Sequence, residues 1–416
     1  MEKQQSSTLL SSFPHNSGFR EKIPRSSTTK RGKVSELSSE FAVYVHIPFC
    51  MRKCPYCDFV SRAVDRSQRI QYLEALSHEI ASSPWHDSQA RTLFVGGGTP
   101  SELTGDEIEK VTEALSTTFS FAPDAEWTIE CNPATVSPPS CDRLLELGFN
   151  RVSIGVQSFD DRHLTRLGRI HSAQDAIETY QLFRDAGFEN INLDLIFGVP
   201  GQTPEEWLSD LETAIDLHPE HLSLYSLTVE PGTEFGRLRD QGLLEMADQD
   251  VMGDMYEAAM DTTDRAGYEH YEISNFSLPG FECEHNFFYW SNSWYLGFGI
   301  AAASYVGGRR WASTNNWEDY LSGAVKGSVP KASEEQLEPR KAMAEEAVLR
   351  LRTRSGIAVS ELAERYACDF EESFGDSVGF LTQHGLLDRT ESTIRLTRKG
   401  KLLFTEVWSE FLRAGS

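Results

Sequence analysis

The segment Tyr44-Val-His-Ile-Pro-Phe-Cys50-Met-Arg-Lys-Cys54-Pro-Tyr-Cys57-Asp58-Phe59 places three cysteines on one short loop, at the spacing CxxxCxxC. The loop follows a short apolar run, residues 43–47, that is typical of a strand. Three thiolates at this spacing can converge on one face of an iron–sulfur cluster. A [4Fe–4S] cluster has four irons, so Cys50, Cys54 and Cys57 would leave one iron without a protein ligand.

A small molecule with an amine and a carboxylate could chelate that fourth iron, and the methionine end of S-adenosylmethionine (SAM) is such a molecule. A zinc site is the alternative, because clustered cysteines in reducing compartments often bind zinc. A structural zinc site takes four ligands, and no second CxxC or HxxxH partner follows the loop. Disulfides are less favoured, since Cys131, Cys141, Cys283 and Cys368 are scattered singly.

Length and composition predict a soluble protein of one large domain and one or two smaller ones. The chain has 416 residues, of which 39% are hydrophobic, and no apolar run is long enough for a membrane span. The formal net charge of −24 argues against non-specific nucleic-acid binding and fits a cytoplasmic enzyme or carrier. Seven cysteines without a repeating framework indicate a reducing compartment.

The first 40 residues differ in composition from the rest of the chain. They hold ten Ser, seven Lys or Arg, four Glu and no Asp. This composition predicts a disordered tail. A transit peptide for the mitochondrion or a plastid is the alternative, although Glu2 and Glu21 and the lack of a clear amphipathic helix weaken it.

Short apolar runs alternate with amphipathic stretches from residue 41 to residue 227. The expected strands are residues 42–47, 92–96, 126–130, 151–156, 190–197 and 221–227, and the expected helices are residues 67–82, 104–119, 137–147, 172–186 and 203–217. Such alternation predicts an α/β fold with a parallel sheet. Six units are too few for an eight-stranded barrel, so we expect a partial (β/α)6 barrel.

Polar residues and glycines gather where these strands end, which is where parallel barrels place their chemistry. Gly96-Gly97-Gly98-Thr99-Pro100 follows the second strand, and glycines there allow close approach to a ligand. Glu130 closes the third strand and could accept a hydrogen bond from a ribose or an amine. Asp194 lies in an apolar strand, where a carboxylate is costly unless it is paired or functional.

A stretch rich in aromatic residues, 271–290, contains Cys283 and His285. Flat apolar side chains around one imidazole would suit a porphyrin, with His285 as an axial iron ligand. A core aromatic cluster around a hydrogen-bonded histidine is the alternative. From about residue 336, helices followed by a hairpin predict a winged-helix-like α+β domain. DNA binding is one reading of that domain, and docking on the barrel or covering its site is the other.

The motifs together resemble one family along nearly the whole chain from Tyr44. They are YxHIPFCxxxCPYCDF, GGGTP, ECNP, VSIGVQSFD with LGRIH, LDLIFGVPGQT, and HNxxYW at 285–290. The chain resembles the anaerobic coproporphyrinogen III oxidase superfamily of radical SAM proteins, and within it the haem chaperone (HemW-type) branch. The resemblance implies a radical SAM barrel at 41–270, a connecting region at 271–335 and the smaller domain at 336–416, after the tail at 1–40.

Two positions depart from the family's patterns. Coproporphyrinogen dehydrogenases carry a fourth motif cysteine, CxxxCxxCxC, and this chain has Phe59 there, which argues against that activity. The chaperone branch usually has a histidine in the small-residue run after the YLGxG element, and the matching position here is Ala303.

The resemblance implies roles residue by residue. Cys50, Cys54 and Cys57 would ligate the [4Fe–4S] cluster. The residues expected around SAM are Tyr44, Tyr56, Gly97, Gly98, Thr99 and Glu130. Residues that match those holding a second SAM in the dehydrogenase are Gln157, Arg169, Asp194 and Thr228. His285 would be the haem ligand.

Two functions follow from the resemblance. In the first, the protein binds haem and delivers it to apo haem proteins, with no nucleic-acid partner. In the second, it is a radical SAM catalyst, in which a reduced cluster cleaves SAM to act on a porphyrin-like substrate such as coproporphyrinogen III. The sequence leaves open whether the protein is an enzyme.

Overall fold

The computed structural model describes residues 40–86 and 88–415. The tail or transit peptide expected at residues 1–40 therefore lies outside the described residues, apart from Glu40. Within the described ranges, no helix is both long and apolar enough to cross a lipid bilayer.

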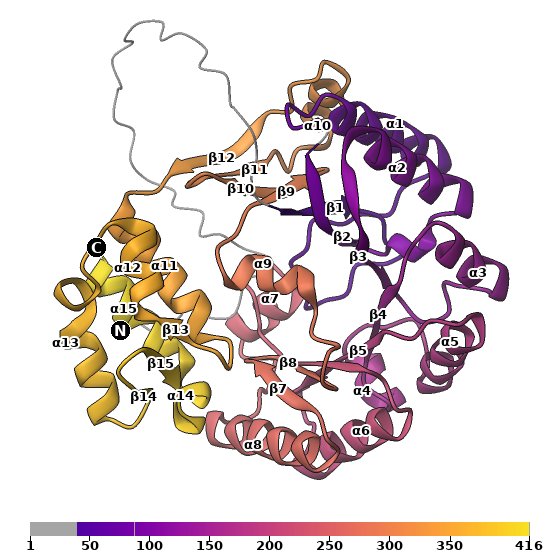
Figure 1. The fold of residues 1–416 in the computed structure, drawn as a ribbon. Helices are drawn as coiled ribbons and strands as arrows, with labels where there is room; N and C mark the ends of the chain where they lie inside the picture. The colour runs from indigo at the N-terminus through magenta and orange to yellow at the C-terminus, as the bar shows by residue number, and fades with distance from the viewer. Residues whose placement is uncertain (1–39, 87, 416) are drawn as a thin grey trace, which may run out of the picture.

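Six parallel strands form the centre of the molecule and curve around an open lumen (Figure 1). The strands are β1 (Phe41–Ile47), β2 (Gln89–Gly97), β3 (Ser120–Cys131), β4 (Arg151–Gln157), β5 (Ile191–Phe197) and β6 (His221–Ser226). Each pairs in parallel with the next, for example Val43 with Leu93 and Leu193 with Leu222. The predicted α/β fold with a partial (β/α)6 barrel is confirmed.

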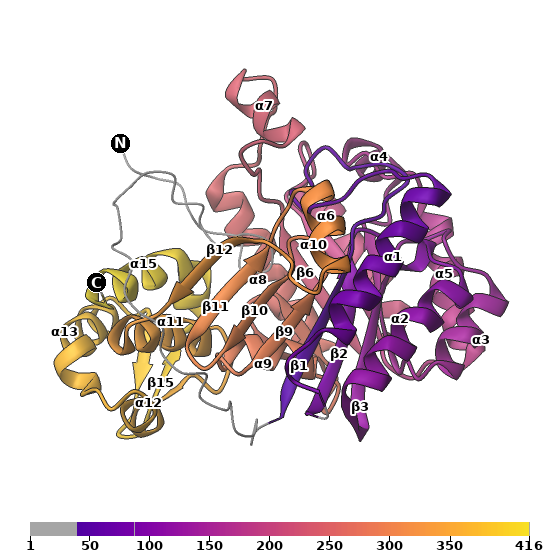
Figure 2. The same cartoon turned by 90° about the horizontal axis from the view of Figure 1, so that it is seen from above.

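Helices follow the strands, and most of them cover the outer face of the sheet (Figures 1 and 2). They are α1 (Arg66–Ala81), the short 3₁₀ turn η1 (Pro100–Glu102), α2 (Gly105–Thr118), α3 (Pro138–Glu146), α4 (Asp161–Arg166), α5 (Ala173–Ala186), α6 (Pro204–Asp216), α7 (Glu234–Asp240) and α8 (Gln249–Arg265). The caps expected at Thr104 and Thr203 are present, and each hydroxyl accepts from the backbone N–H three residues on. Gly187 ends α5 at φ +104°, where a residue with Cβ would be strained.

The sheet continues on both sides of the six strands, which the sequence analysis did not predict. In the described part of the chain it has the order β12-β11-β10-β9-β1-β2-β3-β4-β5-β6-β8-β7. The added strands are β7 (Glu269–Glu272), β8 (Asn275–Ser277), β9 (Tyr295–Phe298), β10 (Ala303–Val306), β11 (Arg309–Ser313) and β12 (Lys331–Gln336). Strand β9 runs parallel to β1, and β8 runs antiparallel to β6.

Two helices of the connecting region have different positions. Helix α9 (Glu284–Trp290) lies at the centre of the ring of strands in Figure 1, and α10 (Trp317–Val325) packs beside α1 on the outside. The aromatic-rich segment thus contains the end of β7, all of β8, and then helix α9.

The C-terminal elements form a separate core of buried side chains between residues 343 and 411. They are α11 (Pro339–Leu351), β13 (Ile357–Ala358), α12 (Val359–Tyr366), α13 (Phe370–Gln383), β14 (Leu387–Arg389), β15 (Thr393–Leu396), α14 (Arg398–Leu402) and α15 (Phe404–Gly415). Helices followed by a hairpin give the winged-helix-like arrangement that the pattern predicted.

Cations of this domain contact the barrel. Arg398 pairs with Asp261 of α8 at 2.6 Å, and Arg352 pairs with the buried Glu272 of β7 at 3.0 Å. The domain therefore lies between the two ends of the curved sheet (Figure 1). Arg352 and Arg398 therefore help to hold the C-terminal domain against the barrel.

Substitution of Gly98 tests how closely the turn after β2 packs against the cysteine loop. A Cβ at Gly98 would lie 2.4 Å from the Phe49 carbonyl oxygen, whereas a Cβ at Gly253 in α8 meets nothing within 4 Å. We expect Gly98→Ala to lower the free energy of unfolding by about 1–3 kcal/mol through overpacking. Gly253→Ala is the matched control, and should stabilise the helix by about 0.5–1 kcal/mol. Chemical denaturation measures both, and equal stability of the two variants would contradict this packing.

Candidate cluster and cofactor site

The cysteine loop is attached to the barrel edge by backbone hydrogen bonds. The Gly98 N–H donates to the Ile47 carbonyl at 2.8 Å, and the Thr99 N–H donates to the Phe49 carbonyl at 2.6 Å. Within the loop, the Cys50 N–H donates to the Arg62 carbonyl at 3.2 Å. Gly168 allows a second close contact, because its Cβ would lie 2.5 Å from Cδ of Pro55, between Cys54 and Tyr56. The loop is thereby fixed over the carboxyl ends of β1, β2 and β4.

Cys50, Cys54 and Cys57 are all partly exposed and carry free thiols. The Cys50 Sγ lies 3.5 Å from the Thr99 hydroxyl. Burial raises the pKa of the Cys57 thiol to about 11, so a thiolate there needs a positively charged partner such as iron.

The spacing of the three sulfurs distinguishes a cluster from a single ion. Tetrahedral zinc–sulfur bonds of about 2.3 Å would bring the sulfurs within about 4 Å of one another. Among the described residues, only Asp160, His163 and Glu206 form a group of three or more possible ligands whose atoms all lie within 4.8 Å. At least one pair of the three thiol sulfurs therefore lies more than 4.8 Å apart, which is wider than two sulfurs on one zinc ion.

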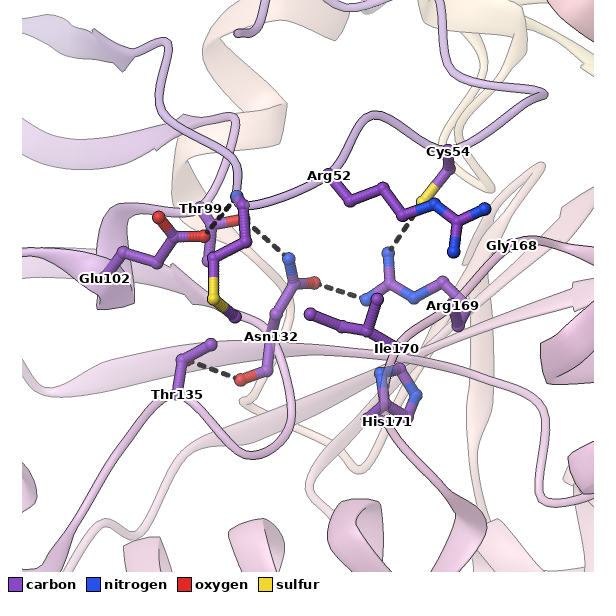
Figure 3. Close-up of a pocket in the computed structure, with 11 residues that line it drawn as sticks. Arg52, Cys54, Thr99, Glu102, Asn132, Thr135, Gly168, Arg169, Ile170 and His171 are labelled. Atoms are coloured by element: carbon purple, nitrogen blue, oxygen red, sulfur yellow. Dashed lines mark hydrogen bonds between the residues drawn. The ribbon is translucent and has the colours of Figure 1, made fainter. Parts of the chain in front are cut away.

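A chain of polar side chains connects the loop with the end of β3 and the segment after α4 (Figure 3). The Asn132 amide donates to the Thr99 hydroxyl at 2.6 Å and accepts from the Arg169 guanidinium. Arg169 also donates to the Cys54 sulfur at 3.6 Å. The Arg169 Nε is buried without a hydrogen-bond partner in the described protein. Cys54, Thr99, Asn132 and Arg169 line one pocket. The unpaired Arg169 Nε–H fits a site in which a polar ligand accepts a hydrogen bond.

Glu130 lies next to the glycine-rich turn. Its carboxylate accepts from the Gly97 N–H at 2.8 Å, and Gly97 has φ +116°, a conformation that favours glycine. Burial raises the pKa of Glu130 to about 7, and the charge of Asp194 acts in the same direction. The Gly97 N–H opposes this rise. A cationic amine nearby would favour the ionised carboxylate.

The other residues expected at SAM sites lie near the same edge of the barrel, where the glycine-rich turn follows β2. The Tyr44 hydroxyl lies 3.0 Å from Nδ1 of His46, and burial raises the pKa of Tyr44. The Tyr56 ring packs near Phe235, with 6.3 Å between ring centroids. Gln157 has φ +70°, and its amide lies beside Gly155, which is close to both Asn132 and Arg169. Thr228 is partly buried after β6.

The Asp194 side chain belongs to a separate group of hydrogen-bonded side chains inside the barrel. Its carboxylate accepts from the Asn192 amide at 2.8 Å and from the Ser153 hydroxyl at 3.0 Å. Burial raises its pKa. The sequence analysis expected Asp194 to be functional or salt-bridged, and these two neutral donors are its closest hydrogen-bond partners.

His285 lies deeper in the barrel and is 1% exposed. Its Nδ1 is 2.7 Å from the Thr92 hydroxyl and its Nε2 is 2.9 Å from the Tyr289 hydroxyl. Thr92 precedes Gly96 by four residues of β2, about 13 Å along the strand, so His285 contacts β2 well away from the glycine-rich turn. Burial lowers the pKa of His285 to about 3, so the imidazole is neutral. Neutral imidazole is the form that binds iron, but both nitrogens are hydrogen-bonded in this conformation.

Helix α9 is held at both ends. At its start, the Glu126 carboxylate accepts from the backbone N–H groups of Glu284 and His285, each at 3.0 Å. At its end, the Arg352 guanidinium lies 4.4 Å from the Trp290 ring centroid, and Arg365 donates to the Ser291 carbonyl at 2.9 Å. The position of His285 thus depends on β3 and on the C-terminal domain.

Sequence reasoning quoted Asn132 and His46 within motifs but assigned neither a role, and it missed Glu126. His46 helps to fix the end of the cysteine loop, since its Nε2 lies 2.8 Å from the Val60 carbonyl oxygen. An acid at 126, four residues before Glu130 and on the same face of β3, was a usable signal. Its partner on α9 was not predictable, because α9 was not expected as a helix.

Comparisons with known proteins agree with these features. Residues 44–214 match the family model described as the radical SAM superfamily, and residues 337–403 match the HemN C-terminal domain. The chain is 36% identical to the heme chaperone HemW of Bacillus subtilis over 89% of this chain and 99% of that protein. It is 41% identical to Escherichia coli heme chaperone HemW over 63% of this chain and 69% of that protein.

A solved structure, coproporphyrinogen III oxidase (HemN) from Escherichia coli, described as a radical SAM enzyme, superposes with a TM-score of 0.79. It is 25% identical in sequence, and the match covers 89% of this chain and 90% of that one.

The buried carboxyl of Glu130 predicts a pH-dependent stability. Because its pKa rises from 4.5 to about 7 on folding, its contribution is greatest below pH 4.5 and is lost as pH rises through 7. Glu130→Gln keeps an acceptor for Gly97 without the charge. Between pH 5 and 8 the wild type should lose roughly 3 kcal/mol at most relative to this variant. Denaturation at several pH values, without added SAM, measures the difference, and parallel profiles would contradict it. Glu113→Gln, at an exposed position, is the control.

Proposed function

The chain belongs to the HemW family of radical SAM proteins, and from that premise we propose that it is a haem chaperone. In this proposal it carries a [4Fe–4S] cluster and SAM, binds haem, and passes haem to apo haem proteins. The observation that carries the proposal is the three-cysteine loop, with Phe59 in place of a fourth cysteine, above a barrel filled by the HNxxYW helix. The proposed compartment is the cytoplasm, or an organelle if residues 1–40 are a transit peptide.

Cys50, Cys54 and Cys57 would hold the cluster, and the polar chain from Arg169 to Thr99 would border it. The cluster supplies an electron that can cleave SAM when both are bound. Glu130 and the Gly97–Thr99 turn would orient SAM, and Arg169 would stabilise negative charge at Cys54. The wide spacing of the sulfurs and the unpaired Arg169 Nε support this assignment.

Replacing a loop cysteine should remove the cluster. We expect Cys54→Ala to lose the absorption near 400 nm and nearly all iron and sulfide after anaerobic reconstitution, because two thiolates hold a cubane poorly. Cys368→Ala, a partly exposed single cysteine in the C-terminal domain, is the matched control and should load normally. Iron and sulfide analysis measures both. Full loading of Cys54→Ala, or zinc in the wild type, would contradict the assignment.

For haem, the proposal places His285 as the iron ligand. Coordination through Nε2 would require the imidazole to give up its hydrogen bond with Tyr289, and Tyr289 itself contacts Tyr295 edge-on at 4.7 Å between centroids. The surrounding rings, among them Phe94 at 5.1 Å from the His285 ring, would provide an apolar surface for a porphyrin. Binding would therefore involve a shift of α9 or of its aromatic neighbours.

Haem titration followed at the Soret band tests this ligand. His285→Ala should bind haem at least about tenfold more weakly and with a shifted band, because a buried iron–imidazole bond is lost. Tyr289→Phe removes the competing hydroxyl and should bind haem as well as the wild type or better. His78→Ala, at an exposed position on α1, is the control, and circular dichroism checks folding. Unchanged binding by His285→Ala would contradict the assignment.

The alternative function is oxygen-independent decarboxylation of coproporphyrinogen III, which the likeness to the HemN structure favours. Phe59 argues against it. Reconstituted protein incubated with dithionite, SAM and coproporphyrinogen III distinguishes the two, since protoporphyrinogen formation would support the alternative and overturn the chaperone proposal.

A further inference from the structure

Arg151, at the start of β4, is a buried cation, and its side chain is not explained by the contacts described so far. The residue is 2% exposed, and its Nε–H has no hydrogen-bond partner. Its guanidinium makes neither a hydrogen bond nor an ion pair with any residue that the structure describes. A buried charge is costly unless it is paired, so the position of Arg151 indicates a site that takes an anion.

Two carboxylates act on Arg151 through their charge, but both are held by other groups. Glu126 accepts from the first backbone N–H groups of α9, and Asp194 accepts from two neutral side chains. Burial lowers the pKa of Arg151, but acidic groups around it, Glu126 and Asp194 among them, raise it overall. The guanidinium therefore stays charged, with its donors available to a further acceptor.

A hydroxyl with the same property lies next to Arg151. Thr128 of β3 is in register with Arg151 of β4, so the two side chains lie on the same face of the sheet. That face is the inside of the barrel, because Ser153, two residues after Arg151, donates to Asp194 there. Thr128 is fully buried, and its Oγ1 has no hydrogen-bond partner in the described part of the chain. One guanidinium and one hydroxyl thus offer donors to the same region.

This region lies near the proposed haem ligand. Phe94 of β2 is in register with Thr128, and its ring centroid is 5.1 Å from that of His285. Neighbouring strands are about 4.8 Å apart, so Arg151, two strands from Phe94, lies about 10 Å away across the sheet. The carboxylates of haem project from the edge of the ring, away from its iron. With iron at His285, a carboxylate would therefore fall near Arg151.

Apolar surface for the ring is available at the same level of the barrel. Phe94 is only partly buried, as is Tyr44, which stacks on it with 6.2 Å between ring centroids. These rings suit the flat apolar centre of a porphyrin, and Arg151 and Thr128 suit an acidic group at its edge. An apolar wall with a few polar groups that fix orientation is the usual composition of a ligand site.

We propose that Arg151 and Thr128 form a subsite inside the barrel for a carboxylate of a porphyrin. The guanidinium would donate two parallel hydrogen bonds to the carboxylate, and the Thr128 hydroxyl would donate one. The inference rests on the proposed function, because it takes haem as the ligand, and it adds the contact that sets the orientation of the ring. A porphyrin without free carboxylates would leave the guanidinium buried and unpaired, so the subsite discriminates against it.

The experiment compares haem with haem dimethyl ester, in which both carboxylates are blocked, on the full chain reconstituted with its cluster. Both porphyrins are added from the same detergent, and the Soret band reports binding. Arg151→Met removes the charge and keeps a long side chain, and Thr128→Val removes only the hydroxyl. Arg143→Met is the matched control, since Arg143 lies on the outer helix α3 and pairs with Glu109 at 2.6 Å. Thermal unfolding of the unbound proteins checks the fold.

We expect Arg151→Met to bind haem about tenfold more weakly than the wild type, and to bind the ester as well or better, because only haem offers a carboxylate. Thr128→Val should weaken haem binding about threefold. The Soret position should not change, since His285 still holds the iron. Unbound Arg151→Met should unfold at the same or a higher temperature, because an unpaired buried charge is replaced by an apolar group. Arg143→Met should match the wild type throughout.

The failure of this inference is distinguishable from that of the proposed function. Equal haem affinity of Arg151→Met and the wild type would overturn the subsite alone. Equal weakening for haem and ester, with a lower unfolding temperature, would also overturn it, because Arg151 would then support the barrel. Equal affinity of the wild type for both porphyrins would overturn it too, since the donors would then serve a small free anion. A wild type that binds neither porphyrin would contradict the proposed function, and the subsite with it.

Discussion

The close backbone approach between the turn after β2 and the cysteine loop is the constraint on which the site depends. Gly98 lies against Phe49 at a distance that leaves no room for a Cβ, and two backbone hydrogen bonds join the segments there. Because the loop is fixed to a rigid sheet, its three thiols hold a defined spacing. The same turn supplies Gly97 and Thr99, so the elements proposed for the cluster and for SAM share one support.

Below that edge, buried carboxylates inside the barrel accept hydrogen bonds from neighbouring groups. Asp194 is satisfied by Asn192 and Ser153, and Glu126 by the first N–H groups of α9. Arg352 and Arg365 then connect the far end of α9 to the C-terminal domain. A porphyrin that reaches His285 would have to disturb contacts among β3, α9 and the C-terminal domain. In this account, haem binding is therefore coupled to motion of the C-terminal domain.

The six-strand core and the cysteine loop were predictable from the sequence because each strand contains a short apolar run and the helices between them are amphipathic, with caps such as Thr104 and Thr203. Strands β7 to β12 were not predictable, since they are short and their pairing depends on distant segments such as β1. The role of Glu126 needed the knowledge that residues 284–290 form a helix. Both ring nitrogens of His285 are hydrogen-bonded, and one of the partners, Thr92, is distant in sequence. No local sequence pattern reveals that contact.

The central claim is that three cysteines hold a cluster whose fourth iron binds the amine and carboxylate of SAM. Electron–nuclear double resonance on the reduced, reconstituted protein with SAM labelled with ¹⁵N at its amine measures this directly. The account predicts a nitrogen coupling strong enough to require an iron–nitrogen bond. A spectrum of the reduced cluster that is unchanged by the label would contradict it.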